Sequence, residues 1–169
     1  GLDVATILEW KVAANESRCR ADLSRANPEN KCRQWIRELV WLGNRHLVVL
    51  DVVETAQPKI LRQWQLHLPG APTLGHRLIE VANRPPVAKW ADESLRPKDA
   101  EGRLFCQTLL PKDFALVLYS GGMVASYGLD GRAKEVAWNQ HHLKYGKHVV
   151  QIDPGTRSSR TVFLNVLTA

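Results

Sequence analysis

Proline and glycine divide this chain of 169 residues into short segments. The 9 prolines and 11 glycines are distributed over the whole sequence and recur roughly every ten residues. Short segments bounded by turn residues at this spacing are typical of an all-β sandwich or barrel. We therefore predict an all-β fold, an antiparallel β-sandwich of about ten strands.

Two segments show the clearest strand patterns. Residues 45–54 are apolar at both odd and even positions, as in a strand that is buried on both faces. Residues 60–68 alternate, which places Trp64 and Leu68 on one side and polar residues such as His67 on the other. Four further segments are β-rich by composition: 102–110, 114–120, 147–152 and 160–167.

Two polar stretches are predicted to connect strands. Residues 83–101 contain three prolines and eight charged residues, which is typical of a long surface loop. Residues 126–132 predict a hairpin turn, because Asp130 and Gly131 tolerate the positive φ that such a turn needs.

One segment conflicts with an all-β fold. Asn27 is a suitable N-cap, Pro28 is favoured at a first helical position and Gly43 is a suitable stop. The apolar residues between them fall at helical spacing: Cys32, Trp35, Ile36, Leu39 and Val40. Taken alone, this pattern favours a helix at 28–42, and the competing prediction is a strand at 34–42.

Size and charge limit the class of protein. The chain has the length of one domain, 1–169, and contains no run of 18 apolar residues that could span a membrane. Its start lacks the features of a signal peptide. The net charge of +6 favours an acidic partner, although it also serves solubility. No RNA-recognition signature is present, so nucleic acid is the weaker hypothesis.

The three cysteines define neither a disulfide framework nor a thiolate zinc site, because no CxxC motif occurs. Cys19 and Cys32 are able to pair if their strands are neighbours, which would leave Cys106 free. The simpler interpretation is that all three are small buried side chains.

Few side chains stand out as candidates for chemistry. Trp90 and Trp138 occur in polar surroundings, and indole rings at such positions stack well on sugar rings. His141, His142 and His148 lack a metal-ligand spacing, and the stretch between Trp138 and Gly146 is interpreted as a polar loop. The tyrosines are interpreted as structural: Tyr119, Tyr127 and Tyr145.

The order of several segments resembles a known family. ADLSRAN (21–27) precedes RQWIRELVWLGNRHLVVLDVVE (33–54) and WQLHLPG (64–70). Later come GRLFCQTLLP (102–111), SGG (120–122), KHVVQIDPG (147–155) and VFLNVL (162–167). Over residues 7–167 this order is similar to the C-terminal β-sandwich region of heparinase II/III-like polysaccharide lyases.

The resemblance implies a strand, not a helix, at 33–42, paired with 45–54 through a turn at Gly43 and Asn44. The sequence departs from the family pattern at Asn27 and Val52 and at the start of the penultimate strand, where it has Gly146, His148 and Val149. The family's N-terminal α/α toroid and the His-rich opening of its sandwich have no counterpart here. The chain is thus expected to be the C-terminal part of a longer lyase, periplasmic or secreted.

The implied chemistry is β-elimination in uronic-acid glycans. The C5 proton is too weakly acidic to leave unless the neighbouring carboxylate is neutralised, a base accepts the proton and an acid protonates the leaving oxygen. In the family these groups come mainly from the toroid and the start of the sandwich. We therefore predict no catalytic residue here, an inactive isolated chain, and a role in supporting the toroid and forming one wall of the cleft for an acidic polysaccharide.

The resemblance also bears on metal binding. His67 matches the histidine of a W-x-L-H motif, which is similar to a ligand of a structural zinc in the heparinase-II-like branch. Its other ligands would lie upstream, so zinc is expected only in a full-length protein. Trp90 and Trp138 remain the substrate-binding candidates. The alternative function is a non-catalytic carbohydrate-binding β-sandwich module that uses these tryptophans.

Overall fold

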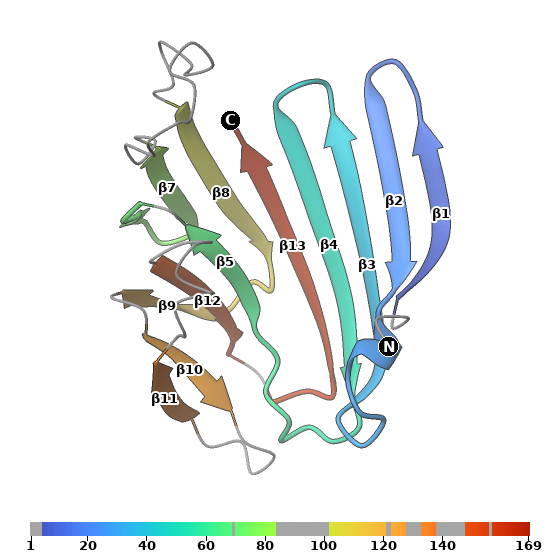
Figure 1. The fold of residues 1–169 in the computed structure, drawn as a ribbon. Coiled ribbons are helices and arrows are strands. Elements are labelled where there is room, and N and C mark those ends of the chain that lie inside the picture. Colours follow the sequence, from blue (N-terminus) through green and yellow to red (C-terminus); the bar gives the residue numbers. More distant parts are fainter. Residues whose placement is uncertain are drawn as a thin grey trace, which may run out of the picture.

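The computed structural model describes residues 5–68, 70–83, 102–120, 123–127, 133–137, 148–155 and 157–169 (Figure 1). These residues form strands joined by turns and one short 3-10 helix, η1 (Ser24–Ala26), so the all-β prediction is confirmed. The strands are β1 (Thr6–Val12), β2 (Glu16–Asp22), β3 (Cys32–Leu42), β4 (His46–Thr55), β5 (Trp64–Leu68), β6 (Thr73–Leu74), β7 (Leu78–Asn83), β8 (Gly102–Leu110), β9 (Phe114–Ser120), β10 (Met123–Tyr127), β11 (Ala133–Ala137), β12 (His148–Pro154) and β13 (Arg160–Thr168).

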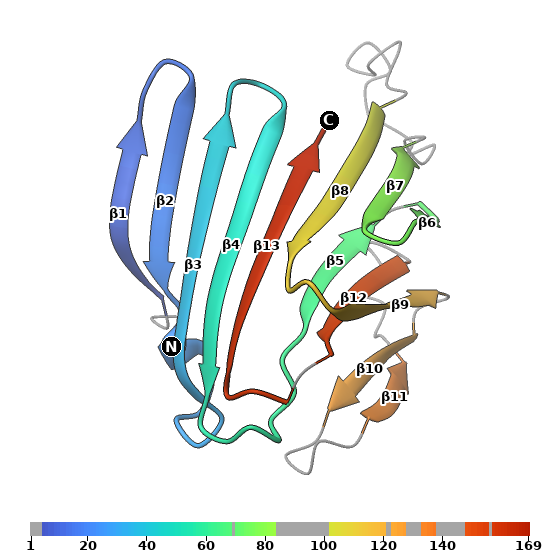
Figure 2. The same ribbon diagram turned by 180° about the vertical axis from the view of Figure 1, so that it is seen from behind.

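The strands form one large sheet and two small ones (Figures 1 and 2). The large sheet has eight strands in the order β1-β2-β3-β4-β13-β8-β7-β6, and the second has the order β5-β12-β9. All pairs are antiparallel, and the C-terminal strand β13 lies between β4 and β8 in the middle of the large sheet. β10 and β11 pair as a hairpin, in agreement with the turn predicted at 126–132, although Ser126 and Tyr127 belong to β10 and 128–132 lie outside the described residues.

The segment with the helical pattern is a strand. β3 pairs with β4 from Cys32 to Leu42 and with β2 over 36–42, and Gly43 ends it with a φ of +56°, which glycine tolerates. Trp35 and Leu39 lie on one face of β3, whereas Ile36 and Val40 lie on the other. Apolar pairs on alternating faces imitate the i, i+3, i+4 spacing of a helix, so the helix predicted at 28–42 is wrong and the strand implied by the resemblance is confirmed.

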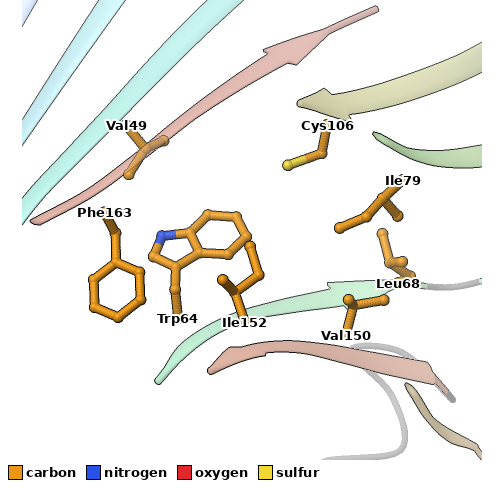
Figure 3. Close-up of a cluster of buried hydrophobic side chains, with 8 residues drawn as sticks. All are labelled: Val49, Trp64, Leu68, Ile79, Cys106, Val150, Ile152 and Phe163. Atoms are coloured by element: carbon orange, nitrogen blue, oxygen red, sulfur yellow. The ribbon is translucent and has the colours of Figure 1, made fainter. Parts of the chain in front are cut away.

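The eight-stranded sheet and the three-stranded β5-β12-β9 sheet pack face to face around one apolar core (Figure 3). The core residues come from both sheets: Val49, Trp64, Leu68, Ile79, Cys106, Val150, Ile152 and Phe163. The alternation predicted for 60–68 is confirmed over β5, which begins at Trp64: Trp64 is 6% exposed and Leu68 1%, while Gln65 and His67 are exposed. Burial of β4 is strong on one face only: Val49 is buried and Val48 half-buried.

The cysteines are all free, and the predicted burial is confirmed for two of them. Cys32 and Cys106 are buried, and Cys19 is half-buried on β2. Cys19 faces Leu39 across the β2–β3 pair, whereas Cys32 faces Thr55 across the β3–β4 pair. The two thiols therefore have different cross-strand partners and are not bonded.

The face that carries the core residues continues over β1, β2 and β3 without a covering sheet in the described part of the chain. Trp10 and Val12 pair across the sheet with residues of β2, which in turn pair with Leu39 and Trp41 of β3. Large apolar side chains are consequently exposed: Trp10 by 64%, Val12 by 68% and Trp41 by 45%. We call Ile7, Trp10, Val12 and Trp41 the open face.

Candidate functional site

A hollow of about 280 Å³ lies where the open face meets the covered part of the sandwich. Its walls come from β3, β4 and β13, from the segment that leads into β5, and from the turn before β3. The side chains that line it are Asn27, Lys31, Cys32, Trp35, Arg37, Asp51, Val53, Thr55, Ile60, Leu61, Arg62, Gln63, Trp64 and Phe163.

A buried carboxylate organises one wall of the hollow. Asp51 is 1% exposed and lies opposite Arg37 in the β3–β4 pair. Its Oδ1 accepts hydrogen bonds from the Trp35 indole N–H at 2.7 Å and from Arg37 Nε at 2.8 Å, and its Oδ2 accepts one from Arg37 Nη2 at 3.0 Å. The Arg37 guanidinium also lies 5.3 Å from the centre of the Trp35 ring. The three side chains thus form one fixed group.

A buried arginine forms the other wall. Arg62, 6% exposed, donates from Nε to the Thr161 hydroxyl at 2.7 Å and from Nη1 to the Thr55 hydroxyl at 3.1 Å. Nη1 also lies 3.3 Å from the Ile60 carbonyl oxygen. Burial lowers the pKa of Arg62, because removal from water disfavours the charged guanidinium. The guanidinium is positioned in the hollow by hydroxyl groups from two strands of the large sheet.

The lining has an excess of positive charge. Lys31, Arg37 and Arg62 contribute three cations, whereas Asp51 is the one carboxylate among the lining residues. Burial raises the pKa of the Cys32 thiol, which therefore stays protonated at neutral pH. The hollow is consequently suited to an anion and not to a thiolate nucleophile or a metal cation.

The predicted site residues do not meet in this hollow. His67 lies on the face of β5 opposite Trp64, paired with Val149 of β12, and so points away from the core. Within the described ranges no three histidine, cysteine or acidic residues are grouped to hold a metal ion, so zinc binding by His67 stays a prediction. Trp90 and Trp138 lie outside the described residues, as do His141, His142 and Tyr145.

Two of the other side chains considered from the sequence are described in strands. Tyr119 is half-buried in β9, opposite Val149. His148 starts β12, and its Nδ1 lies 2.9 Å from the Ser120 hydroxyl. Both residues belong to the three-stranded β5-β12-β9 sheet, in agreement with a structural interpretation for Tyr119. Neither residue lines the hollow.

The sequence contains one indication of the hollow, which a search for catalytic or metal-binding residue types does not find: charged residues at core-facing positions. Asp51 is an acid flanked on both sides by apolar residues of β4, and Arg62 has the same parity as Trp64 and Leu68. A charged side chain on a core-facing position requires a partner, because an isolated buried charge is costly. The parity of the strands therefore places Asp51 and Arg62 inside, but only the structure shows that they line the same cavity.

Comparison with known proteins identifies the class of fold. No family model matches the chain, and no curated protein does. Solved structures do match over 97% of the chain: heparan sulfate lyase HepC from Pedobacter heparinus with a TM-score of 0.56 at 14% identity, and a mutant of it with 0.56 at 15%. The sandwich thus has the fold of a region within a polysaccharide lyase.

A second enzyme of this kind has the same fold. Heparinase III, the BT4657 gene product with methylated lysines, matches with a TM-score of 0.59 at 9% identity, again over 97% of the chain. In each case the chain spans about a fifth of the other protein, 21% of its length. None of the helices in the described ranges is long and apolar enough to cross a membrane.

Proposed function

We propose that this chain is the β-sandwich part of a heparinase II/III-like polysaccharide lyase, which cleaves uronic-acid-containing glycans by β-elimination. The alignment carries the proposal: nearly all of the chain, 97%, superimposes on 21% of heparan sulfate lyases. A domain of this kind supports a catalytic α/α toroid and forms one wall of the substrate cleft. We assign no catalytic residue to it.

The open face supports this proposal. Monomeric soluble proteins seldom expose contiguous apolar patches of this kind unless another surface covers them. Ile7, Trp10, Val12 and Trp41 gather on one end of the sheet, and each is at least 45% exposed. The chain spans only 21% of the length of the similar lyases, and we assign the toroid of a longer protein as the partner that covers this face.

The distribution of charge also supports the proposal. The chain carries 23 basic against 17 acidic residues, and a net positive surface attracts an acidic glycan by long-range electrostatics. The hollow adds a local cationic site with aromatic walls. An acidic polysaccharide handled outside the cytoplasm, periplasmic or secreted, fits these properties, and a zinc ion held in part by His67 would belong to the complete protein.

The proposal is tested with the chain and with the longer protein that contains it. Heparan sulfate and heparin are incubated with each, and the absorbance of unsaturated uronate is followed. We expect product from the longer protein and none from the chain, although the folded chain should be retained on immobilised heparan sulfate and not on a neutral glucan.

Two outcomes would contradict the proposal in different ways. Turnover by the chain alone would mean that it contains a complete catalytic site. Retention of the chain together with no turnover by the longer protein would favour the alternative, a non-catalytic carbohydrate-binding module. A heat-unfolded sample serves as the control, because retention by net charge alone would survive unfolding.

A further inference from the structure

The hollow presents cations from three separate parts of the fold to one space. Lys31 comes from the turn before β3, Arg37 from β3 and Arg62 from the segment before β5. Asp51 neutralises one of them through its bidentate pair with Arg37. No ion pair of Lys31 is found in the described part of the chain. Lys31 therefore adds a positive charge to the cavity that an anionic ligand would neutralise.

Arg37 retains unused donors in a fixed orientation. A guanidinium carries five N–H groups, and Asp51 accepts from Nε and Nη2 only. Over the described ranges no acceptor takes the N–H groups of Nη1. The pair with Asp51 and the contact with the Trp35 ring hold the guanidinium plane in place, so little entropy is lost when it binds a planar or tetrahedral anion.

Arg62 adds a buried cation behind this group. Its guanidinium is held by Thr161 and Thr55 and lines the same cavity. Because burial disfavours its charged form, an anion that enters the hollow would interact with it at low dielectric and offset part of that cost. Water-exposed lysines and arginines on the outer strands interact more weakly with an anion, because water screens their charge.

The remaining walls suit a sugar ring better than a bare ion. Trp35 gives the main aromatic surface, since Trp64 and Phe163 are only 6% and 1% exposed, and Ile60 and Val53 add apolar surface. The C–H faces of a pyranose pack on indole rings, while its anionic group requires the cations. A volume of about 280 Å³ is near the lower end for small-ligand pockets, which start at roughly 300 Å³, and suits one sugar unit with its substituent.

We propose that this hollow is a binding site for one acidic sugar unit, with its carboxylate or sulfate between Lys31 and Arg37 and its ring against Trp35. The sugar identity rests on the proposed function, whereas the anionic group rests on the geometry of the hollow alone. We assign this site to binding and orientation only.

The test uses the Trp35 indole N–H as a reporter, because it donates to Asp51 within the site. Its two-dimensional NMR signal is assigned with Trp35→Phe. The chain is then titrated with a heparan sulfate disaccharide, glucuronate, a sulfated glucosamine, neutral N-acetylglucosamine, sodium sulfate and sodium acetate. We expect the acidic sugars to shift the signal with saturation and the neutral sugar to leave it unchanged.

Three variants locate the site. Lys31→Ala should weaken the disaccharide about two- to fivefold, as expected for one partly exposed charge. Arg37→Lys should weaken it about tenfold or more, because lysine keeps the charge but loses the fork of N–H donors. Lys112→Ala removes the same charge from an exposed turn outside the hollow and should leave the affinity unchanged. Thermal unfolding confirms that each variant is folded.

The outcomes separate this inference from the proposed function. If the folded chain binds heparan sulfate but all three variants bind it equally well, the hollow is not the site and the proposed function still stands. If sodium sulfate or acetate binds as tightly as the acidic sugars, the hollow recognises a bare anion and the sugar assignment is wrong. If acidic sugars bind there but the longer protein cleaves no glycan, the site stands and the proposed function fails.

Discussion

Removal of the Asp51 carboxylate should destabilise the fold by an amount that the structure allows us to work out. Asp51→Ala takes the acceptor from the Trp35 indole and from two nitrogens of Arg37 at once. Breaking a buried ion pair by removing one partner costs about 3–5 kcal/mol. The Arg37 side chain is 36% exposed, so water solvates part of its charge and the lower end applies, about 3 kcal/mol.

Asp51→Asn removes the negative charge but keeps an oxygen that accepts hydrogen bonds, so it measures the contribution of the charge separately. The amide oxygen still accepts from Trp35, so the loss is the difference between charged hydrogen bonds and neutral ones, about 1–2 kcal/mol. For a chain of this size each kcal/mol lowers the Tm by about 2–4 °C. We therefore expect a decrease of about 6–12 °C for Asp51→Ala and of about 2–8 °C for Asp51→Asn.

Urea denaturation followed by tryptophan fluorescence and circular dichroism measures these differences, provided that the m-value is unchanged. Asp113→Ala, in the exposed turn between β8 and β9, is the matched control and should change the free energy of unfolding by no more than about 0.5 kcal/mol. A double-mutant cycle with Arg37→Ala should give a coupling energy within the range of about 0.5–3 kcal/mol. An Asp51→Ala variant as stable as the Asp113 control would refute the reasoning.

Three further predictions concern buried groups. Asn165 is fully buried, and within the described ranges its side-chain amide has no hydrogen-bond partner. Asn165→Leu should therefore raise the free energy of unfolding by about 1–3 kcal/mol. A lower Tm of this variant would contradict the prediction. Burial raises the pKa of Cys106 to about 12, so iodoacetamide followed by mass spectrometry should label Cys19 first and leave Cys106 unmodified until unfolding. Burial also raises the pKa of Asp153, with a smaller opposite effect of Gln63. The unfolded chain therefore releases this proton at lower pH than the folded chain. The buried carboxylate consequently destabilises the folded state; this effect is absent below the pKa of the unfolded chain and complete above the pKa of the folded one. Asp153→Asn should accordingly stabilise the protein at pH 7 and lose that advantage near pH 3, whereas an equal effect at both pH values would exclude the pKa as its cause.

Local sequence pattern predicted most of the strands, including β4, whose residues are apolar on both faces, but misread β3. In β5, Trp64 and Leu68 are core residues and His67 is exposed, so alternation alone was sufficient. In β3 both faces carry apolar side chains, and the resulting spacing is shared by a strand and a helix. Pairing with β2 and β4 decides between them, and pairing between distant segments is not a property of a local window.

The candidate site was predictable only in part for the same reason. The parity of the strands places Asp51 and Arg62 on inward positions, as it does Phe163. What the sequence does not contain is that β13 pairs with β4, which brings Thr161 opposite Val53 and so within reach of Arg62. Contacts between residues 99 positions apart, such as this one, are set by sheet topology. His67, the residue favoured from the resemblance, faces away from the hollow.

The position of the hollow connects the fold to the proposed function. Its lining includes Trp64 and Phe163 from the closed core, and also Trp35 and Arg37 from β3, the strand whose Trp41 belongs to the open face. The β5-β12-β9 sheet, which covers the core, thus ends beside the cavity. The cations of the cavity lie next to the open face, to which we assign the toroid. A glycan unit held by Lys31 and Arg37 would then also contact whatever covers the open face. For this reason acidic-sugar affinity should be higher in the longer protein than in the chain, and Trp10→Ser should reduce that difference without changing the affinity of the chain itself.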